Sequence, residues 1–314
     1  MFVCLSPNPA IDKRLRLSRL VPGCVNRATE VHPAPGGKAA HVAMVLRTLG
    51  ADPQWIGFAG GASGQDLLAG LRKIGIRAKG IAVEQSTRVN LEIIDDSASV
   101  TEILEPGAAP SETEIASFIA VCEEAFAHGK SQTIVIASGS LPPGVPEDFY
   151  ANLIARAHSH GCRFFLDTSG EPLRRALEAG PDFVKPNREE AEWLTASVIA
   201  DPSSAVVVIR RLLAAGAKSA AISLGERGLF WCPGNAQTVY FAPPVAVQVH
   251  SSVGSGDSTV AAFAHAAAAG LPTEETLRLA AACGAANCLA DSPGALRAGD
   301  VRRLQKEIRV EALR

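Results

Sequence analysis

The chain has little net charge and no paired cysteines. Its 30 lysines and arginines nearly balance 32 aspartates and glutamates, which gives a net charge of −2 and a pI of about 6.4. Without a general basic field, the chain has no broad attraction for nucleic acid. The seven cysteines form no Cys-x-x-Cys pair, and the spacing of Cys283 and Cys288 is poor for metal ligands. We expect reduced thiols and neither a disulfide framework nor a cysteine-bound metal.

Long apolar runs are also missing. The longest weakly apolar stretch, Val260 to Leu271, is too short to span a bilayer and contains His265. The N-terminal letters MFVCLSPNPAID have the pattern of a short apolar strand and lack the basic region of a signal peptide. We therefore expect a soluble cytoplasmic protein with no nucleic-acid or membrane partner.

Short apolar segments alternate with amphipathic segments through most of the chain. The apolar segments are bounded by Gly, Pro, Asn or Ser, as buried parallel strands are, and lie at 2–5, 54–58, 133–137, 163–167, 182–185 and 219–224. The helical patterns include 38–49, 64–74, 112–127, 147–159, 188–195, 203–215, 257–269, 273–289 and 299–311. This alternation predicts an α/β fold, a doubly wound and mainly parallel sheet with helices on both faces. Ligands of such sheets bind beyond the carboxyl ends of the strands.

Two regions, 11–35 and 86–105, break this alternation. Both alternate polar and apolar residues and contain turn signals, which is typical of antiparallel hairpins with one solvated face. They predict a small β lid over an α/β core formed by 1–10, 36–85 and 106–314; alternatively, 11–20 is the basic start of a helix. Exposed strand edges invite pairing with another copy, so we expect a homodimer through the lid.

A glycine-rich turn opens the helical pattern at 257–269. Gly254, Ser255 and Gly256 precede Asp257, so several backbone N–H groups point one way, at the positive end of the helix dipole. Such a site binds an anion, most readily a phosphate. A carboxylate beside it is useful for taking a proton during phosphoryl transfer. The alternative is that Asp257 merely caps the helix.

Two stretches near the N-terminus place polar groups where ligands of such a sheet bind. Gly36, Gly37 and Lys38 precede a helical pattern, so a ligand can approach the backbone closely and Lys38 supplies a charge suited to a phosphate or hydroxyl. Asp12 follows the first strand and could accept hydrogen bonds from sugar hydroxyls. An ordinary loop and a turn carboxylate would give the same letters.

Two later stretches also carry candidate ligand contacts. Arg88 and Asn90 lie two apart on a strand and so share a face, where the guanidinium fork matches phosphate oxygens and the amide adds a donor. Ser138 closes a very apolar strand, at a place where a ligand contact belongs. A solvated strand face and a plain turn are the competing interpretations.

Asn187 and Glu190 lie three apart at a helix start, so both can face one ligand. A carboxylate and an amide oxygen suit a Mg²⁺ ion that keeps most of its waters and bridges phosphates. A simple capping box would give the same letters, and both interpretations can hold at once. Further along, Ser223, Gly225 and Gly228 lie between two strand patterns, where glycines allow a flat base or ribose to lie against the backbone.

These stretches together resemble the PfkB branch of the ribokinase-like sugar kinases. The motifs occur in the family's order and approximate spacing over essentially the whole chain: NPAID, PGGK, TRVN, SGSLPPG, KPNREEAE, SLGERG and VGSGDS. Within the family, the chain looks most similar to the 1-phosphofructokinase and tagatose-6-phosphate kinase group. The resemblance implies an α/β core with a β lid, and it implies ATP and Mg²⁺ as cofactors.

The resemblance also implies a role for each candidate residue. Asp257 would be the general base, and the amides of Gly254, Ser255 and Gly256 would stabilise the transferring phosphoryl group. Asn187 and Glu190 would hold the hydrated Mg²⁺, and the nucleotide would lie against Lys185, Asn187, Ser223, Gly225, Gly228 and Asn287. Asp12 and Gly37 would fix the sugar hydroxyls. The existing phosphate of the substrate would be bound by Lys38, Arg88, Asn90 and Ser138.

Two departures from the family pattern affect the substrate. Phosphosugar members usually read GGKGxNV, whereas this chain has Ala39 in place of a flexible glycine and His41 in place of an amide at a sugar-contacting position. The family turn usually reads GAGD, and Ser255 replaces its alanine. The predicted activity is ATP-dependent phosphorylation of a ketohexose monophosphate, first fructose 1-phosphate. The alternatives are tagatose 6-phosphate, fructose 6-phosphate, or a regulator that has lost catalysis.

Overall fold

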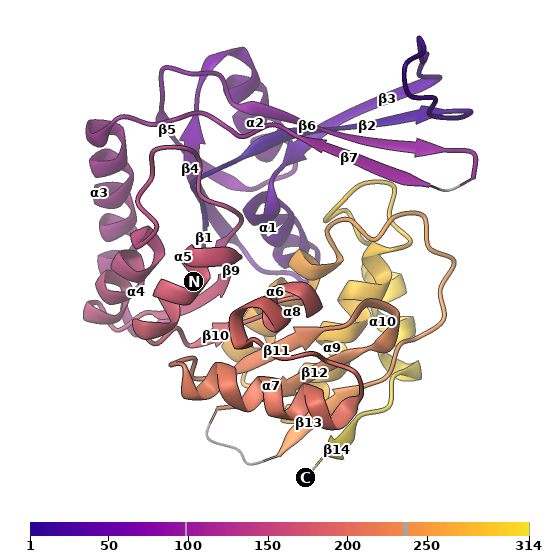
Figure 1. The fold of residues 1–314 in the computed structure, drawn as a ribbon. Coiled ribbons are helices and arrows are strands. Elements are labelled where there is room, and N and C mark those ends of the chain that lie inside the picture. The colour runs from indigo at the N-terminus through magenta and orange to yellow at the C-terminus, as the bar shows by residue number, and fades with distance from the viewer. Residues whose placement is uncertain (98, 235–237, 314) are drawn as a thin grey trace.

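The computed structural model describes residues 1–97, 99–234 and 238–313 (Figure 1). Its larger sheet, within the described residues, has ten strands in the order β14-β13-β12-β11-β10-β9-β8-β1-β4-β5. Their bounds are β1 (Phe2–Ser6), β4 (Pro53–Ala59), β5 (Arg77–Ala82), β8 (Ile134–Ser138), β9 (Arg163–Asp167), β10 (Phe183–Val184), β11 (Ala220–Ser223), β12 (Leu229–Cys232), β13 (Val239–Ala242) and β14 (Glu311–Leu313). Pairing is parallel from β5 to β11 and antiparallel from β11 to β14.

The central strands are apolar on both faces because helices cover both. Along β1, Val3 and Leu5 belong to one core cluster and Phe2 and Cys4 to the other, as the alternation of a strand requires. All five residues of β1 are buried. The predicted doubly wound, mainly parallel sheet is therefore confirmed.

Helices enclose the two clusters. The cluster with Val3 packs under α3 (Glu112–Gly129), α4 (Phe149–Ser159), α5 (Gly170–Glu178) and α7 (Pro202–Ala214). The cluster with Phe2 packs under α1 (Lys38–Thr48), α2 (Gly61–Lys73), α8 (Ser255–Ala269), α9 (Thr273–Asn287) and α10 (Ala298–Glu307). Short helix α6 (Arg188–Thr195) and the 3₁₀ turns η1 (Lys130–Gln132) and η2 (Gly225–Arg227) complete the described helices.

A second sheet extends away from the first at the upper right of Figure 1. Its strand order is β3-β2-β6-β7, with bounds β2 (Ala10–Leu17), β3 (Glu30–Gly36), β6 (Arg88–Asp95) and β7 (Val100–Leu104). Strands β2 and β3 pair antiparallel, as do β6 and β7, while β2 and β6 pair parallel and join the two hairpins. The alternative of a helix over 11–20 is wrong, because β2 occupies most of that range. The division into core and lid stays a prediction.

The C-terminal segment differs from its predicted helix over 299–311. Helix α10 ends at Glu307, and the chain turns extended at Ile308, whose side chain is buried. Glu311–Leu313 then forms edge strand β14 against β13. Pairing with β13, which is distant in the sequence, outweighs the local helical pattern. The seven cysteines are free thiols, and a search of the described helices found none with the length and apolarity of a membrane span.

Candidate active site

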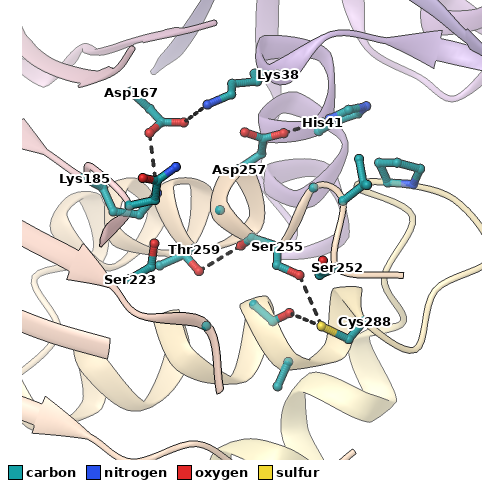
Figure 2. Close-up of a pocket in the computed structure, with 18 of the residues that line it drawn as sticks. Lys38, His41, Asp167, Lys185, Ser223, Ser252, Ser255, Asp257, Thr259 and Cys288 are labelled. Carbon is teal, nitrogen blue, oxygen red and sulfur yellow. Dashed lines mark hydrogen bonds and ion pairs between the residues drawn. The ribbon is translucent and has the colours of Figure 1, made fainter. Parts of the chain in front are cut away.

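One large cavity, of about 1260 Å³, contains most of the predicted site residues. Its wall includes α1, strands of the small sheet, the N-terminus of α8 and the carboxyl ends of β9 to β11. Figure 2 shows Lys38, Asp167 and Asp257 on this wall. The predicted residues that line it are Asp12, Gly37, Lys38, His41, Arg88, Asn90, Lys185, Asn187, Glu190, Ser223, Gly225, Gly228, Gly254, Ser255, Gly256 and Asp257. Residues that the sequence singles out, between positions 12 and 257, are thus brought together by the fold in one cavity.

The N-terminus of α8 provides backbone donors at the cavity wall. Gly254 caps the helix with a φ of 84°, and a Cβ there would lie 2.8 Å from the Cβ of Pro293, so glycine is required. The amide of Ser255 donates to the carbonyl of Ser252 at 3.1 Å. The amides of Gly256 and Asp257 have no acceptor in the described part of the chain. The donors available to an anion are therefore Gly256 and Asp257, and Ser255 is occupied by the turn.

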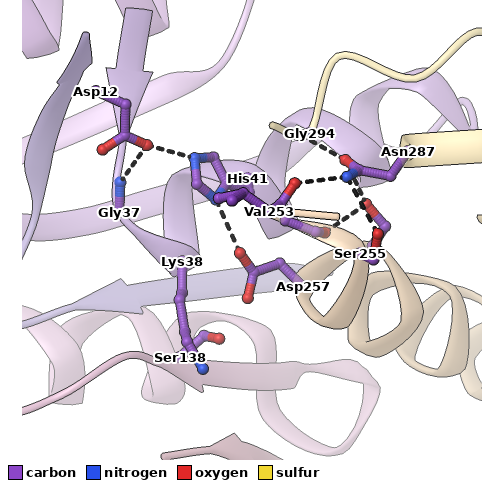
Figure 3. A network of polar contacts seen from close by, with 12 residues as sticks. Asp12, Gly37, Lys38, His41, Ser138, Val253, Ser255, Asp257, Asn287 and Gly294 are labelled. Carbon is purple, nitrogen blue, oxygen red and sulfur yellow. Dashed lines mark hydrogen bonds and ion pairs between the residues drawn. The ribbon is translucent and has the colours of Figure 1, made fainter. Parts of the chain in front are cut away.

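His41 lies between two carboxylates (Figure 3). Its Nδ1 is 2.8 Å from Oδ2 of Asp257, and its Nε2 is 2.8 Å from Oδ2 of Asp12. The same Asp12 oxygen accepts the Gly37 amide at 3.4 Å, and the other oxygen accepts Nδ2 of Asn90 at 2.9 Å. Because Asp257 comes from α8 and Asp12 from the small sheet, the ring connects the two sides of the cavity.

Both ring contacts favour the charged form of the histidine. Burial alone lowers the pKa of His41, but hydrogen bonds to Asp12 and Asp257, and their negative charges, outweigh it and raise the pKa to about 10. Burial tends to raise the pKa of Asp12, and the hydrogen bond and charge of His41 bring it below its ordinary value. At neutral pH an imidazolium therefore donates to both carboxylates.

Asp167 is a site residue that sequence reasoning missed. It ends β9, is buried, and its Oδ2 accepts Nζ of Lys38 at 3.1 Å. Nζ of Lys185 lies 3.4 Å from its other oxygen. Burial opposes ionisation, but the charges of Lys185 and Lys38 hold the pKa of Asp167 below its ordinary value. The available signal was an aspartate at the carboxyl end of a strand predicted over 163–167.

Arg88 and Asn90 present buried polar atoms without partners. Arg88 Nη1 donates to the carbonyl of Glu105 at 2.8 Å and Nη2 to the carbonyl of Asn8 at 3.1 Å, so two carbonyls brace the guanidinium. Its Nε and the Oδ1 of Asn90 are buried, and neither has a hydrogen-bond partner among the described residues. A buried polar atom left unpaired is costly, and a ligand in the cavity would supply the missing partners.

Asn187 and Glu190 form the capping box of α6. The side chain of Asn187 accepts the Glu190 amide at 2.9 Å, and Glu190 Oε2 accepts the Asn187 amide at 2.8 Å. Both residues also line the cavity, so the capping interpretation and the ligand interpretation are compatible. Among residues 1–97, 99–234 and 238–313, no three His, Cys, Asp or Glu side chains gather as a direct metal site. One carboxylate and one amide oxygen fit a hard cation held through its own waters.

The turn between β11 and β12 contributes two glycines to the cavity wall. Gly225 and Gly228 have φ values of 57° and 92°, and a Cβ at Gly228 would lie 2.4 Å from the carbonyl of Ala242. Ser223 and the small residues Gly284 and Ala285 also line the cavity. A flat ring can lie against such backbone and small side chains.

Two predicted contacts lie behind the cavity wall. Ser138 is buried, and its hydroxyl donates at 3.4 Å to Oδ2 of Asp167, which itself lines the cavity. Asn287 is buried too, donates to the carbonyl of Val253 at 2.7 Å and accepts the amide of Gly294 at 2.8 Å. Neither lines the cavity within the described residues. Their contacts hold Asp167 and the loop before α8 in place.

A family model described as the pfkB family carbohydrate kinase matches residues 8–296. The chain belongs to the PfkB family of carbohydrate kinases. The 1-phosphofructokinase of Xanthomonas campestris pv. campestris is 34% identical over 311 residues, which cover 97% of this chain and 94% of the relative. The 1-phosphofructokinase of Bacillus subtilis is 29% identical over 313 residues, which cover 100% of both chains.

Solved structures agree with this PfkB membership. Phosphofructokinase-2 from Escherichia coli in complex with fructose-6-phosphate has a TM-score of 0.88, with 28% identity and 98% of each chain covered. The tetrameric inhibited form of that enzyme has a TM-score of 0.88, with 29% identity and the same coverage. The ribokinase-like fold follows, and the chain is a phosphotransferase with an alcohol acceptor, a phosphofructokinase-type sugar phosphate kinase.

Proposed function

We propose that this protein transfers the γ-phosphoryl group of ATP to the 6-hydroxyl of fructose 1-phosphate and forms fructose 1,6-bisphosphate. The names of the two bacterial relatives support this substrate. The observation that carries the chemistry is the position of Asp257. Its side chain, 6% exposed, lines the same cavity as the unpaired amides of α8 and the cations Lys38 and Arg88. A base, anion donors and phosphate-binding cations around one cavity suit phosphoryl transfer between two phosphorylated molecules.

In this proposal Asp257 is the general base. The substrate hydroxyl oxygen forms a bond to the γ-phosphorus, and the bond from that phosphorus to the bridging oxygen of ADP breaks. The hydroxyl proton goes to Oδ1 of Asp257, because Oδ2 is bonded to His41. The amides of Gly256 and Asp257 face the transferring group. The loss of such a donor typically costs about 10²–10³ in rate.

The sugar phosphate is bound at the α1 and small-sheet side of the cavity. Asp12 accepts hydrogen bonds from sugar hydroxyls beside Gly37, and Lys38, Arg88 and Asn90 hold the phosphate. This phosphate would accept a hydrogen bond from the Nε of Arg88, which has no other partner among the described residues. Ser138 acts indirectly, through its hydrogen bond to Asp167.

ATP occupies the remaining cavity, with its base near Gly225 and Gly228 and its phosphates near Lys185. A Cβ at Gly256 would lie 3.2 Å from Nζ of Lys185, so this ammonium is close to the N-terminus of α8. A hydrated Mg²⁺ would be held by Asn187 and Glu190, and it would neutralise charge on the phosphates. The chain itself supplies Lys185 and the backbone amides for the same purpose.

Fructose 6-phosphate is the second candidate substrate, because the E. coli phosphofructokinase-2 structure contains it. A furanose ketohexose is nearly symmetric end to end, so one pocket can accept either monophosphate reversed. Tagatose 6-phosphate is a third ketohexose phosphate of the same shape. A regulator that binds these ligands without catalysis would have no need of Asp257 as a base.

The test is a coupled ADP-release assay over fructose 1-phosphate, fructose 6-phosphate, tagatose 6-phosphate and the unphosphorylated sugars. We expect the highest kcat/KM with fructose 1-phosphate, and we expect Asp257→Asn to lose turnover while it still binds ATP in calorimetry. Near-normal turnover by Asp257→Asn would remove the assignment of the base. Binding of sugar phosphates by the wild-type protein without ADP release would favour a regulator.

We further propose that the small sheet is a lid and the contact surface of a homodimer. Strands β3 and β7 are its two edges, and both carry exposed apolar side chains: Val31, Val100, Ile103 and Leu104. Unpaired edges and exposed apolar groups favour association. Light scattering should give the mass of a dimer, and a charge on the edge, Ile103→Glu, should shift it to the monomer. A monomeric wild type at assay concentration would contradict the proposal.

A further inference from the structure

His41 is enclosed on all sides. It lies one turn after Lys38 on α1, so both residues face the cavity. Only 4% of the residue is exposed. On its other side the backbone of Gly294 packs so closely that a Cβ there would lie 2.8 Å from the Cα of His41. The ring therefore has little freedom to leave Asp12 and Asp257.

The ring selects which carboxylate oxygen faces the substrate. At Asp257, Oδ2 is taken by His41, and Oδ1 has no partner among the described residues. At Asp12, Oδ2 is shared by His41 and the Gly37 amide, and Oδ1 accepts Asn90. A rotation of either carboxylate about its last side-chain bond would break a bond to the same imidazole. The orientations of the two carboxylates are thus coupled through one rigid group.

An amide at position 41, which the family pattern usually has, cannot form this connection. Asn is shorter, and it donates only from its NH₂ group, while its oxygen repels a second carboxylate. An imidazolium donates from opposite sides of a planar ring, so it can bridge two carboxylates that face each other. The bridge is therefore a feature of this chain's own sequence.

The charges around the ring favour the bridging form. Asp12 on β2 and Asp257 on α8 are bonded to it, and Glu102 on β7 adds negative charge within electrostatic range. The nearest cation on its own helix, Lys38, is directed to Asp167. Hence the negative groups that face the ring outnumber the positive ones.

We propose that His41 is a positioning residue that links recognition of the sugar at Asp12 to orientation of the base Asp257. This inference rests on the proposed function, because it takes Asp12 as a sugar contact and Asp257 as the base. When the sugar hydroxyl binds Asp12, the carboxylate is fixed, the ring is fixed with it, and Oδ1 of Asp257 is held toward the cavity. Asp257 remains the group that takes the proton.

The first experiment examines the ring itself. Nitrogen NMR of the unliganded full-length protein, with the His41 signals assigned by comparison with His41→Asn, should show both ring nitrogens protonated at pH 8. An unperturbed histidine is neutral at that pH. The signals of the exposed His128 on α3 provide the internal reference.

The second experiment measures kinetics of His41→Asn and of the control His128→Asn. We expect kcat with the best sugar phosphate to fall by about 10²-fold in His41→Asn, the scale of a misplaced catalytic group. The KM for ATP should change less than about twofold, since the ring bonds to Asp12 and Asp257 and to none of the residues proposed to hold the nucleotide. The wild-type rate should fall at alkaline pH as the ring loses its proton, and this limb should be absent from His41→Asn. His128→Asn should behave as the wild type.

Each outcome bears on the inference. A neutral His41 ring at pH 8, or a folded His41→Asn with wild-type kcat and pH profile, would overturn the linkage and leave the proposed function intact. A wild-type protein that phosphorylates no sugar phosphate would overturn the proposed function and the linkage together. Circular dichroism of His41→Asn ensures that a loss of rate is not a loss of fold. Should the variant be unfolded, His41→Gln, which keeps a donor at greater reach, is measured against the same expectations.

Discussion

The guanidinium of Arg14 forms a two-point ion pair with the carboxylate of Glu92. Nε lies 2.8 Å from Oε2 and Nη2 lies 3.0 Å from Oε1, and the two side chains are 4% and 7% exposed. Arg14 also donates to the backbone carbonyls of Ala290 and Asp291, and the hydroxyl of Ser251 donates to Glu92. Strands β2 and β6 are therefore tied to the loop before α8 and to the loop after α9.

Arg14→Met should be strongly destabilising, because it leaves the Glu92 carboxylate buried without its cation. Breaking a buried pair in this way costs about 3–5 kcal/mol. Urea unfolding followed by circular dichroism measures the change. The control is Arg16→Met on the same strand, whose side chain is 45% exposed and whose pair with Glu30 should contribute less than about 1 kcal/mol. Equal effects of the two substitutions would contradict the view that the Arg14 pair fixes the small sheet.

Arg88→Ala should raise the KM for the sugar phosphate and leave the KM for ATP nearly unchanged. Loss of a charged hydrogen bond costs about 1.5–3 kcal/mol, or about 10–10²-fold in KM. Arg88→Lys should not restore binding, because an ammonium cannot keep the contacts to Glu105 and Asn8 and still donate from the position of Nε. Steady-state kinetics with each substrate varied in turn decides this. A variant that keeps the wild-type preference for the sugar phosphate over the unphosphorylated sugar would mean that Arg88 does not bind phosphate.

The stability contribution of His41 should depend on pH in a defined direction. Its pKa is 6.5 as an unperturbed group and about 10 in the folded protein, so folding favours the protonated ring. The contribution is complete below about pH 6.5, decreases as pH rises, and is lost above about pH 10. The difference in unfolding free energy between wild type and His41→Asn should therefore be larger at pH 6 than at pH 9.5. A difference that stays constant or grows over this range would show that the ring is not charged in the folded state.

The sequence was sufficient to predict the sheet and its helical layers, and most of the predicted site residues line the cavity. Lys38 and Asp257 lie in the first turn of a helix and Lys185 follows a strand, and the topology of a parallel sheet brings such positions to one edge. The position of a residue next to a predicted strand or helix therefore indicated where it lies in the folded protein. The family order of motifs then connected these positions to a phosphotransferase.

Contacts across the cavity could not be read from the sequence. Asp167 follows an ordinary apolar strand, and its importance depends on Lys38, which lies 129 positions away. His41 is visible as a substitution where the family pattern has an amide, but its place between two carboxylates depends on how α1 meets α8. Ser138 and Asn287 match the family motifs, although their side chains lie behind the wall. Packing, which is set by the whole fold, decides on which side of a wall a side chain lies.

Gly36→Ala should impair the sugar site alone. A Cβ at position 36 would lie 2.2 Å from Cγ of Asp12, so the carboxylate must rotate away and give up its bonds to His41 and Asn90. We expect the KM for the sugar phosphate to rise by about 10–10²-fold, the equivalent of one charged hydrogen bond, with the KM for ATP within twofold. The matched control is Gly299→Ala on α10. An added Cβ there has no atom of the described residues within 4 Å, so the kinetics should be unchanged. A Gly36→Ala enzyme with wild-type sugar affinity would show that Asp12 in this position is not a substrate contact.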